Sequence, residues 1–170
     1  MAMLGVIMAG LLAVQTTAPA PAVAGCPVGG AVPAEYQGWE AQQGVTAGTG
    51  IADPATLALG RSARATLVPV VRITFPAPSG HAGERGTMGG VFAVDADRPG
   101  TYRLALGATV SADMAAGDKV LPALAHGHGP DCSGIGRYLD YRIDKPGRYL
   151  IQVAGSRTPE LVLMVIRQGD

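Results

Sequence analysis

No cluster of lysine or arginine occurs in this sequence, and its 13 basic and 13 acidic residues cancel. A chain without a basic patch has no electrostatic footprint for nucleic acid. The N-terminal apolar run is well short of the ~20 residues that a membrane-spanning helix needs. The Gly-x-Ser-x-Gly motif, at which many hydrolases place their nucleophile, is also missing. These absences argue against a nucleic-acid-binding protein, a spanning anchor and a hydrolase.

Cysteine and tryptophan are scarce, so each position is informative. Cys26 and Cys132 are the only cysteines. An even number of cysteines in an exported chain favours a disulfide, which would close a loop of about a hundred residues and stabilise the fold by ~4–5 kcal/mol in the chain-entropy model. Trp39, the only tryptophan, is expected to cover an edge of the core near Cys26. The alternative is that it stacks on a ligand.

Residues 1–24 are typical of a signal peptide. Residues 1–14 are apolar, and residues 22–24 read Ala-Val-Ala, a small-residue cleavage site. An earlier candidate site is followed by Pro21, which should block cleavage. Lys and Arg are absent from the start, which leaves open a translation start further upstream. A second alternative is a lipobox ending at Cys26, but acylation there would leave Cys132 as an odd thiol.

A ten-residue motif occurs twice, at residues 97–106 and 144–153, with a constant offset of 47. Each copy begins with Asp, a basic residue, Pro and Gly, and its tyrosine, Tyr102 or Tyr149, stands two residues after the Gly. Apolar residues alternate before the Asp and again after the Tyr. Pro-Gly supplies a turn, because Pro fixes φ at the second turn position and Gly tolerates positive φ at the third. The repeat therefore predicts two β-hairpins.

The remaining chain alternates short apolar runs with turn residues, and no helical period is sustained after Gly50. Residues 1–24 are expected to form the signal peptide, 25–50 an irregular N-terminal segment, and 51–170 a single all-β domain. We predict a β-sandwich with jelly-roll or Greek-key-like connections. Its nine to ten short strands are expected at residues 56–59, 63–68, 70–75, 91–96, 101–106, 110–114, 119–125, 138–143, 148–153 and 161–166.

Strand periodicity also predicts which side chains face the core. The period of two places Tyr102 inward together with Leu104 and Leu106. The same parity places Phe92, Tyr141 and Tyr149 inward and Tyr138 outward. Residues 161–166 are apolar at every position, which indicates a central strand covered on both faces or one that lies beneath a partner.

Several motifs carry a resemblance to known proteins. The Pro-Gly-x-Tyr-x-Leu hairpins resemble those of extracellular β-sandwich modules, such as bacterial pre-peptidase C-terminal domains and carbohydrate-binding modules. The whole chain resembles a group of short exported bacterial proteins, some of which are named homogentisate 1,2-dioxygenase. The matching features are Cys-Pro at 26–27, Gly-Trp at 38–39, the Pro-Gly-Thr-Tyr-Arg-Leu-Ala-Leu-Gly run at 99–107, Ala-His-Gly-His-Gly-Pro at 125–130, Cys-Ser-Gly at 132–134, and Gly-Arg-Tyr-Leu at 147–150.

That resemblance implies a non-haem iron site, and His126, His128 and Asp131 are the candidate ligands. Two His and a carboxylate can form a facial triad that leaves positions open for substrate and O₂. The spacing departs from the cupin pattern, however, because Asp131 comes early and no later His follows His128. His81 could complete a site only if its loop folds over. The competing interpretation is a Gly-rich loop in which both His side chains bond the backbone beside a disulfide.

We therefore expect an exported β-sandwich of the cell envelope, periplasmic or secreted, with a binding or structural role. No cofactor is expected, and the partner would be an unknown small molecule or envelope protein, with no nucleic acid and no transmembrane span in the mature chain. Binding of a peptide at an edge strand also remains open. The alternative function is a homogentisate 1,2-dioxygenase-like oxidoreductase that holds iron at His126 and His128.

Overall fold

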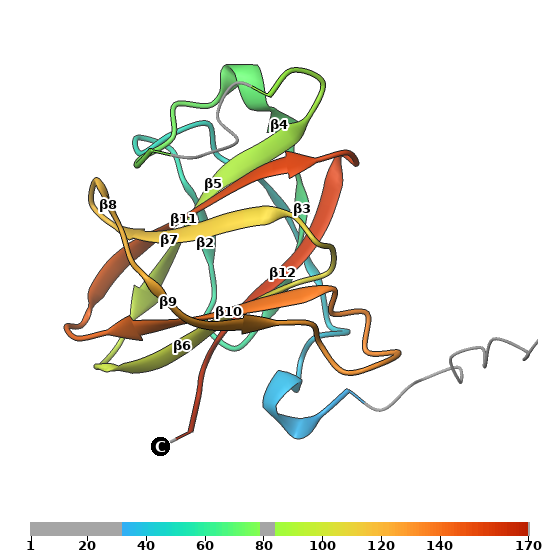
Figure 1. Cartoon of the computed structure of the whole chain (residues 1–170), viewed down its shortest axis with the longest axis vertical. Helices are drawn as coiled ribbons and strands as arrows, with labels where there is room; N and C mark the ends of the chain where they lie inside the picture. Colours follow the sequence, from blue (N-terminus) through green and yellow to red (C-terminus); the bar gives the residue numbers. More distant parts are fainter. Residues whose placement is uncertain (1–31, 79–83, 170) are drawn as a thin grey trace, which may run out of the picture.

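The computed structural model describes residues 32–78 and 84–169, and they form an all-β sandwich, as the sequence predicts (Figure 1). The described residues contain twelve strands, of which β4 and β8 have only two residues each. The elements in chain order are η1 (Ala34–Tyr36), β1 (Gln43–Thr46), β2 (Ala55–Leu57), β3 (Ser62–Thr66), β4 (Val68–Pro69), η2 (Val70–Arg72), β5 (Met88–Ala96), β6 (Gly100–Leu106), β7 (Ser111–Ala116), β8 (Lys119–Val120), β9 (Ala123–Gly127), β10 (Arg137–Ile143), β11 (Gly147–Ser156) and β12 (Glu160–Arg167).

Two mixed sheets make up the sandwich. Sheet A has the order β1-β3-β12-β6-β10-β9, and sheet B has the order β2-β5-β11-β7-β8, with β4 also paired to β5. The pairs β1–β3 and β2–β5 are parallel, whereas the other strand pairs are antiparallel. From β5 to β12, five of the seven connections cross between the sheets, and only β7–β8 and β9–β10 stay within one sheet. This alternation is the connectivity of a jelly roll.

The repeated motif differs from the prediction in one respect: its two strands do not form a hairpin. The first copy leads from β5 in sheet B to β6 in sheet A, and the second leads from β10 in sheet A to β11 in sheet B. Each Pro-Gly turn is fastened by its tyrosine, since the hydroxyl of Tyr102 donates to the carbonyl of Arg98 at 2.7 Å and that of Tyr149 to the carbonyl of Lys145 at 2.8 Å. Related tyrosine corners occur in other β-sandwiches.

The strands of the two copies pair with each other in matching register. On one side β5 pairs with β11, with Val94 opposite Tyr149. On the other side β6 pairs with β10, with Tyr102 opposite Tyr141. The repeat offset of 47 relates the two pairs, since it separates Val94 from Tyr141 and Tyr102 from Tyr149. The two copies are therefore related by a local pseudo-two-fold axis, and each copy completes the sheets of the other.

The main core lies between the sheets, and the predicted parity is confirmed. The inward side chains Phe92, Tyr102, Leu104, Leu106, Tyr141 and Tyr149 are all buried, whereas Tyr138 is only half-buried. Burial of apolar surface of this kind is the main favourable contribution to folding. Strand β12 is central in sheet A, as predicted, because Leu163 and Val165 face the main core while Met164 and Ile166 face a second cluster.

That second cluster covers the outer face of sheet A. Segment 32–42, which includes η1, lies on this face and contributes the largest side chains. Trp39 is 4% exposed, so the prediction that it covers an edge of the core is confirmed. The buried members are Tyr36, Trp39, Ala105, Ile135, Met164 and Ile166.

Two segments differ from the sequence prediction. Residues 70–75 were predicted as a strand, but Val70–Arg72 form the 3-10 turn η2, and Val71 is 66% exposed. Pro69 precedes this turn, and the amide of Ile73 closes it on the carbonyl of Val70 at 3.0 Å. Conversely, the segment 25–50 predicted to be irregular contains β1, which joins sheet A, so the sandwich begins before residue 51.

Some predictions fall on residues that the structure does not describe. The signal peptide at 1–24, Cys26 and His81 all lie outside the described residues. Within 32–78 and 84–169, no helix is both long and apolar enough to cross a bilayer.

Candidate functional site

The outer face of sheet A carries a hollow, and segment 38–42 forms one of its walls. Gly38 permits this wall to lie close to the sheet, because its φ is +96° and an added Cβ would lie 3.2 Å from the carbonyl oxygen of Gly60. Ser62 on β3 anchors the same segment, since its hydroxyl lies 2.8 Å from the carbonyl oxygens of both Gly38 and Trp39. Trp39 is thereby held at the rim of the hollow.

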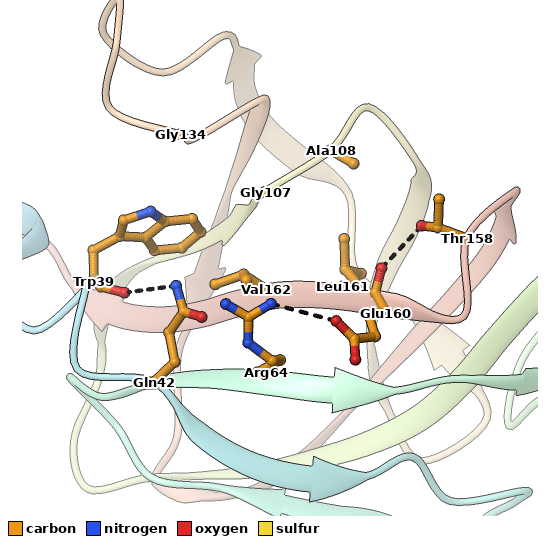
Figure 2. Close-up of a pocket in the computed structure, with 10 residues that line it drawn as sticks. All are labelled: Trp39, Gln42, Arg64, Gly107, Ala108, Gly134, Thr158, Glu160, Leu161 and Val162. Atoms are coloured by element: carbon orange, nitrogen blue, oxygen red, sulfur yellow. Dashed lines mark hydrogen bonds and ion pairs between the residues drawn. The ribbon is translucent and has the colours of Figure 1, made fainter. Parts of the chain in front are cut away.

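We call this hollow the Trp39 pocket. It has a volume of about 450 Å³, within the usual range for sites that bind small molecules. Figure 2 shows the indole of Trp39 at one end, Thr158 at the other, and Val162 and Arg64 between them. Its lining residues are Trp39, Gln42, Arg64, Gly107, Ala108, Gly134, Thr158, Glu160, Leu161 and Val162.

An ion pair lies on the floor of the Trp39 pocket. Nη1 of Arg64 on β3 lies 3.3 Å from Oε2 of Glu160 on β12, and the two side chains are 54% and 58% exposed. They meet because the strands are adjacent, with Arg64 opposite Val162. In the described part of the chain this is the one polar contact of the guanidinium, and it engages a single nitrogen of Arg64 and a single oxygen of Glu160.

The wall of the pocket is apolar where it meets this pair. Val162 contributes to the floor, and Ala108 lies across from it (Figure 2). The close approach of the 107–108 segment favours glycine, because the amide of Gly107 donates to the carbonyl of Val162 at 2.8 Å and an added Cβ would lie 3.2 Å from the Cβ of Val162. The pocket thus combines one apolar wall with two exposed, opposite charges.

A second hollow of about 350 Å³ adjoins the Trp39 pocket and shares Gly107 and Gly134 with it. His128 and Asp131, two of the three predicted metal ligands, line this second hollow together with Cys132. His126 does not: it lies on the edge strand β9, which ends at Gly127. The structure therefore brings two of the three predicted site residues together and leaves the third apart.

His128 is tied to the backbone of its own loop. Its Nδ1 lies 2.9 Å from the carbonyl oxygen of Gly136, which requires a proton on Nδ1. The loop is closed by two further contacts, from the amide of Gly129 to the carbonyl of Ile135 at 3.2 Å and from the hydroxyl of Ser133 to the carbonyl of Pro130 at 2.6 Å. This bonding of His128 to the backbone matches the interpretation of a Gly-rich loop.

The described residues do not assemble a metal centre. In 32–78 and 84–169, no group of three or more His, Cys, Asp or Glu side chains is placed to hold an ion. Cys132 is not a free thiol, and its predicted partner Cys26 lies outside the described residues. The Cys26–Cys132 disulfide therefore stays a prediction, and iron binding stays part of the alternative hypothesis.

The sequence did not reveal an ionic network beneath segment 32–42. Arg103 on β6 donates to both carboxylate oxygens of Asp140 on β10, at 2.7 and 2.9 Å. Its Nη1 also lies 3.1 Å from Glu35 and 3.1 Å from the hydroxyl of Tyr36, and the guanidinium carbon lies 4.1 Å from the ring centre of Tyr138. This network fastens η1, and with it Trp39, to sheet A.

Electrostatics in the network follow from these contacts. The hydrogen bonds that Arg103 donates to Asp140 raise the pKa of its guanidinium, which is therefore always charged. Burial raises the pKa of the Tyr36 hydroxyl, and the nearby Arg103 opposes this rise in part. Both groups therefore keep a single protonation state at neutral pH. The sequence held part of the information about this network, because strand alternation places Arg103 and Asp140 on outward positions. To place the two side chains together, however, one must know that β6 pairs with β10.

None of the protein-family models matches this chain, and none of the curated proteins compared with it matches either.

Proposed function

We propose that this chain is an exported β-sandwich binding protein of the cell envelope that binds a small molecule in the Trp39 pocket. The observation that carries the proposal is the pocket itself. It joins an apolar wall to two exposed charges within about 450 Å³, the mixture of surface that small-molecule sites use for affinity and orientation. The signal-peptide pattern of residues 1–24 supports export.

Trp39 makes the proposal directly testable. It is the only tryptophan and it lines the pocket, so its indole N–H resonance and its fluorescence report on the surroundings of this pocket. The mature protein would be titrated with a panel of small metabolites that covers neutral, anionic, cationic and zwitterionic compounds. We expect at least one class to shift the indole signal in a saturable way.

A matched variant separates pocket binding from contact elsewhere. Ala108→Leu adds bulk at the wall of the pocket (Figure 2) and should abolish the shift while the protein stays folded, as shown by an unchanged circular dichroism spectrum. A panel in which no compound moves the Trp39 signal of the folded protein would overturn the proposal. So would a shift that survives in Ala108→Leu.

The iron dioxygenase stays the alternative hypothesis, and no observation here favours it. His128 and Asp131 share a hollow, but His126 lies apart on β9. Anaerobic reconstitution with ferrous iron, followed by homogentisate and air, tests it independently. Ring cleavage that disappears in both His126→Ala and His128→Ala would favour the dioxygenase.

A further inference from the structure

The Arg64–Glu160 pair offers a cation and an anion side by side to whatever enters the Trp39 pocket. The two charged groups are 3.3 Å apart, and both are more than half exposed. The backbone around them is fixed, since Arg64 lies on β3 and Glu160 on β12, which are paired along their length. The hydroxyl of Thr158 donates to the carbonyl of Glu160 at 3.0 Å and further holds this end of the pocket.

We infer that the pocket binds a small zwitterion of the α-amino acid type, with its carboxylate on Arg64, its ammonium on Glu160 and an apolar side chain along Val162. This inference rests on the proposed function and names its ligand class. An α-amino acid carries its two charged groups on one carbon atom, so they lie side by side, as the two charges of the pocket do. A guanidinium can hold a carboxylate through two parallel N–H donors, and only one nitrogen of Arg64 is engaged by Glu160.

Exchange of partners explains why such a ligand could enter. An ion pair on a protein surface is weak, because water screens it and holding two long side chains in place costs entropy. A zwitterion replaces this single contact with two charge-assisted contacts and keeps the total charge of the pocket unchanged. A ligand with a single charge would instead pair with one of the two side chains and leave the other without an opposite charge.

Selectivity for the apolar side chain follows from the wall. Val162 lies beside Arg64, and Ala108 lies across the pocket from it (Figure 2). Val162 and Ala108 offer no hydrogen-bonding side chains, so a branched aliphatic group fits this surface better than a polar one. L-Leucine is therefore the probe that matches the pocket, and its two blocked derivatives are the natural comparison.

The test uses the Trp39 indole signal with three probes: L-leucine, leucinamide, which lacks the carboxylate, and N-acetyl-leucine, which lacks the ammonium. We expect leucine to bind about tenfold or more tightly than either derivative, since a hydrogen bond between charged groups adds at least that factor. Arg64→Gln should remove the preference for leucine over leucinamide. Glu160→Gln should remove the preference for leucine over N-acetyl-leucine.

A matched control comes from the other sheet. Arg148 and Asp95 form a similar exposed ion pair, with 3.8 Å between Nη1 and Oδ2 and exposures of 50% and 64%, and neither residue lines the Trp39 pocket. Arg148→Gln and Asp95→Asn should leave all three affinities unchanged. This control separates a local effect from a general change in surface charge.

The outcomes separate the two claims. If leucine and its derivatives bind equally, or if none binds while another compound of the panel shifts the Trp39 signal, the zwitterion inference is overturned and the binding function stands. If no compound shifts the signal, both fail. If the two neutralising variants change all three affinities alike, the ion pair acts on the shape of the pocket only and the inference is likewise overturned.

Discussion

Arg103 connects the N-terminal segment to sheet A, and its removal should be costly. Its side chain and that of Asp140 are 15% and 11% exposed. Arg103→Ala would leave the Asp140 carboxylate buried without its partner. We expect the free energy of unfolding to fall by about 3–5 kcal/mol, the usual cost of breaking a buried pair from one side, as measured by urea denaturation.

The control for this prediction is a solvent-exposed ion pair on the same sheet. Arg142 on β10 contacts Asp144 at 3.2 Å with exposures of 58% and 79%. Arg142→Ala should change stability by less than about 1 kcal/mol. Equal losses in the two variants would show that burial of the Arg103–Asp140 pair does not decide its contribution.

Tyr141 should make the fold sensitive to alkaline pH. Burial raises the pKa of its hydroxyl from 10.0 to about 12. The unfolded chain therefore loses this proton at a lower pH than the folded chain does. The corresponding stability is fully present below pH 10 and is lost as the pH rises towards 12, by roughly 2–3 kcal/mol.

Urea denaturation over the range from about pH 9 to pH 12 measures this loss. Tyr141→Phe should make the decline shallower, because that residue no longer titrates. Part of the decline should persist, since burial also raises the pKa of Tyr36 and of Tyr102. An identical decline in the variant and the parent would contradict the assignment to Tyr141.

At the scale of single elements, the loop that lines the second hollow depends on Gly129. An added Cβ there would overlap the Cβ and the carbonyl oxygen of Ile135. Gly129→Ala should lower the free energy of unfolding by about 1–3 kcal/mol, the range for overpacking, as read from thermal unfolding. Gly44→Ala on β1 is the control, because nothing lies within 4 Å of its added Cβ, and it should be neutral. Equal midpoints would contradict the close packing of this loop.

Element boundaries were predictable where the pattern is local. The alternation before and after each Pro-Gly turn predicted β5, β6, β10 and β11, and the uniform apolarity of residues 161–166 predicted a central strand. Sheet membership was not predictable, because alternation shows which face of a strand is buried but not which strand lies beside it. The pairing of β5 with β11 and of β6 with β10 appears only in three dimensions.

The same limit applies to the candidate site. The sequence singled out His128 and Asp131, which are close along the chain, and they do share a hollow. Arg64 and Glu160 are 96 residues apart, so no local pattern could join them. Trp39 was predicted as a core cover with ligand contact as an alternative, and it is both buried and a lining residue of the pocket.

For the whole molecule, we predict both the N-terminus of the exported protein and its disulfide. The exported protein should begin at Gly25, because of the cleavage site at 22–24, and Cys26 should be bonded to Cys132. Intact mass spectrometry, with and without reduction, measures both. A diacylglyceryl group on Cys26 would favour the lipobox, and two alkylatable thiols per unfolded chain would contradict the disulfide.

Loss of that disulfide should also lower stability. Cys132→Ser is expected to cost about 2–5 kcal/mol, as is usual for a native disulfide in a small exported domain. The comparison is with Ser133→Ala, which leaves both cysteines in place and removes the hydroxyl contacts to Pro130 and Ile135. If Cys132→Ser unfolds no more readily than Ser133→Ala, the bond makes no thermodynamic contribution.

The pseudo-two-fold exchange of strands has a kinetic consequence. Neither copy of the repeat can build a sheet alone, because each of its strands pairs with a strand of the other copy. The central pairs must therefore wait until distant parts of the chain meet, and a topology dominated by such non-local pairs folds slowly. A nascent chain that ends before β11 lacks the strand that lies between β5 and β7, so sheet B stays incomplete. Slow folding of this kind would keep the polypeptide unfolded, and therefore able to pass through a secretion channel, until its last strands have been synthesised.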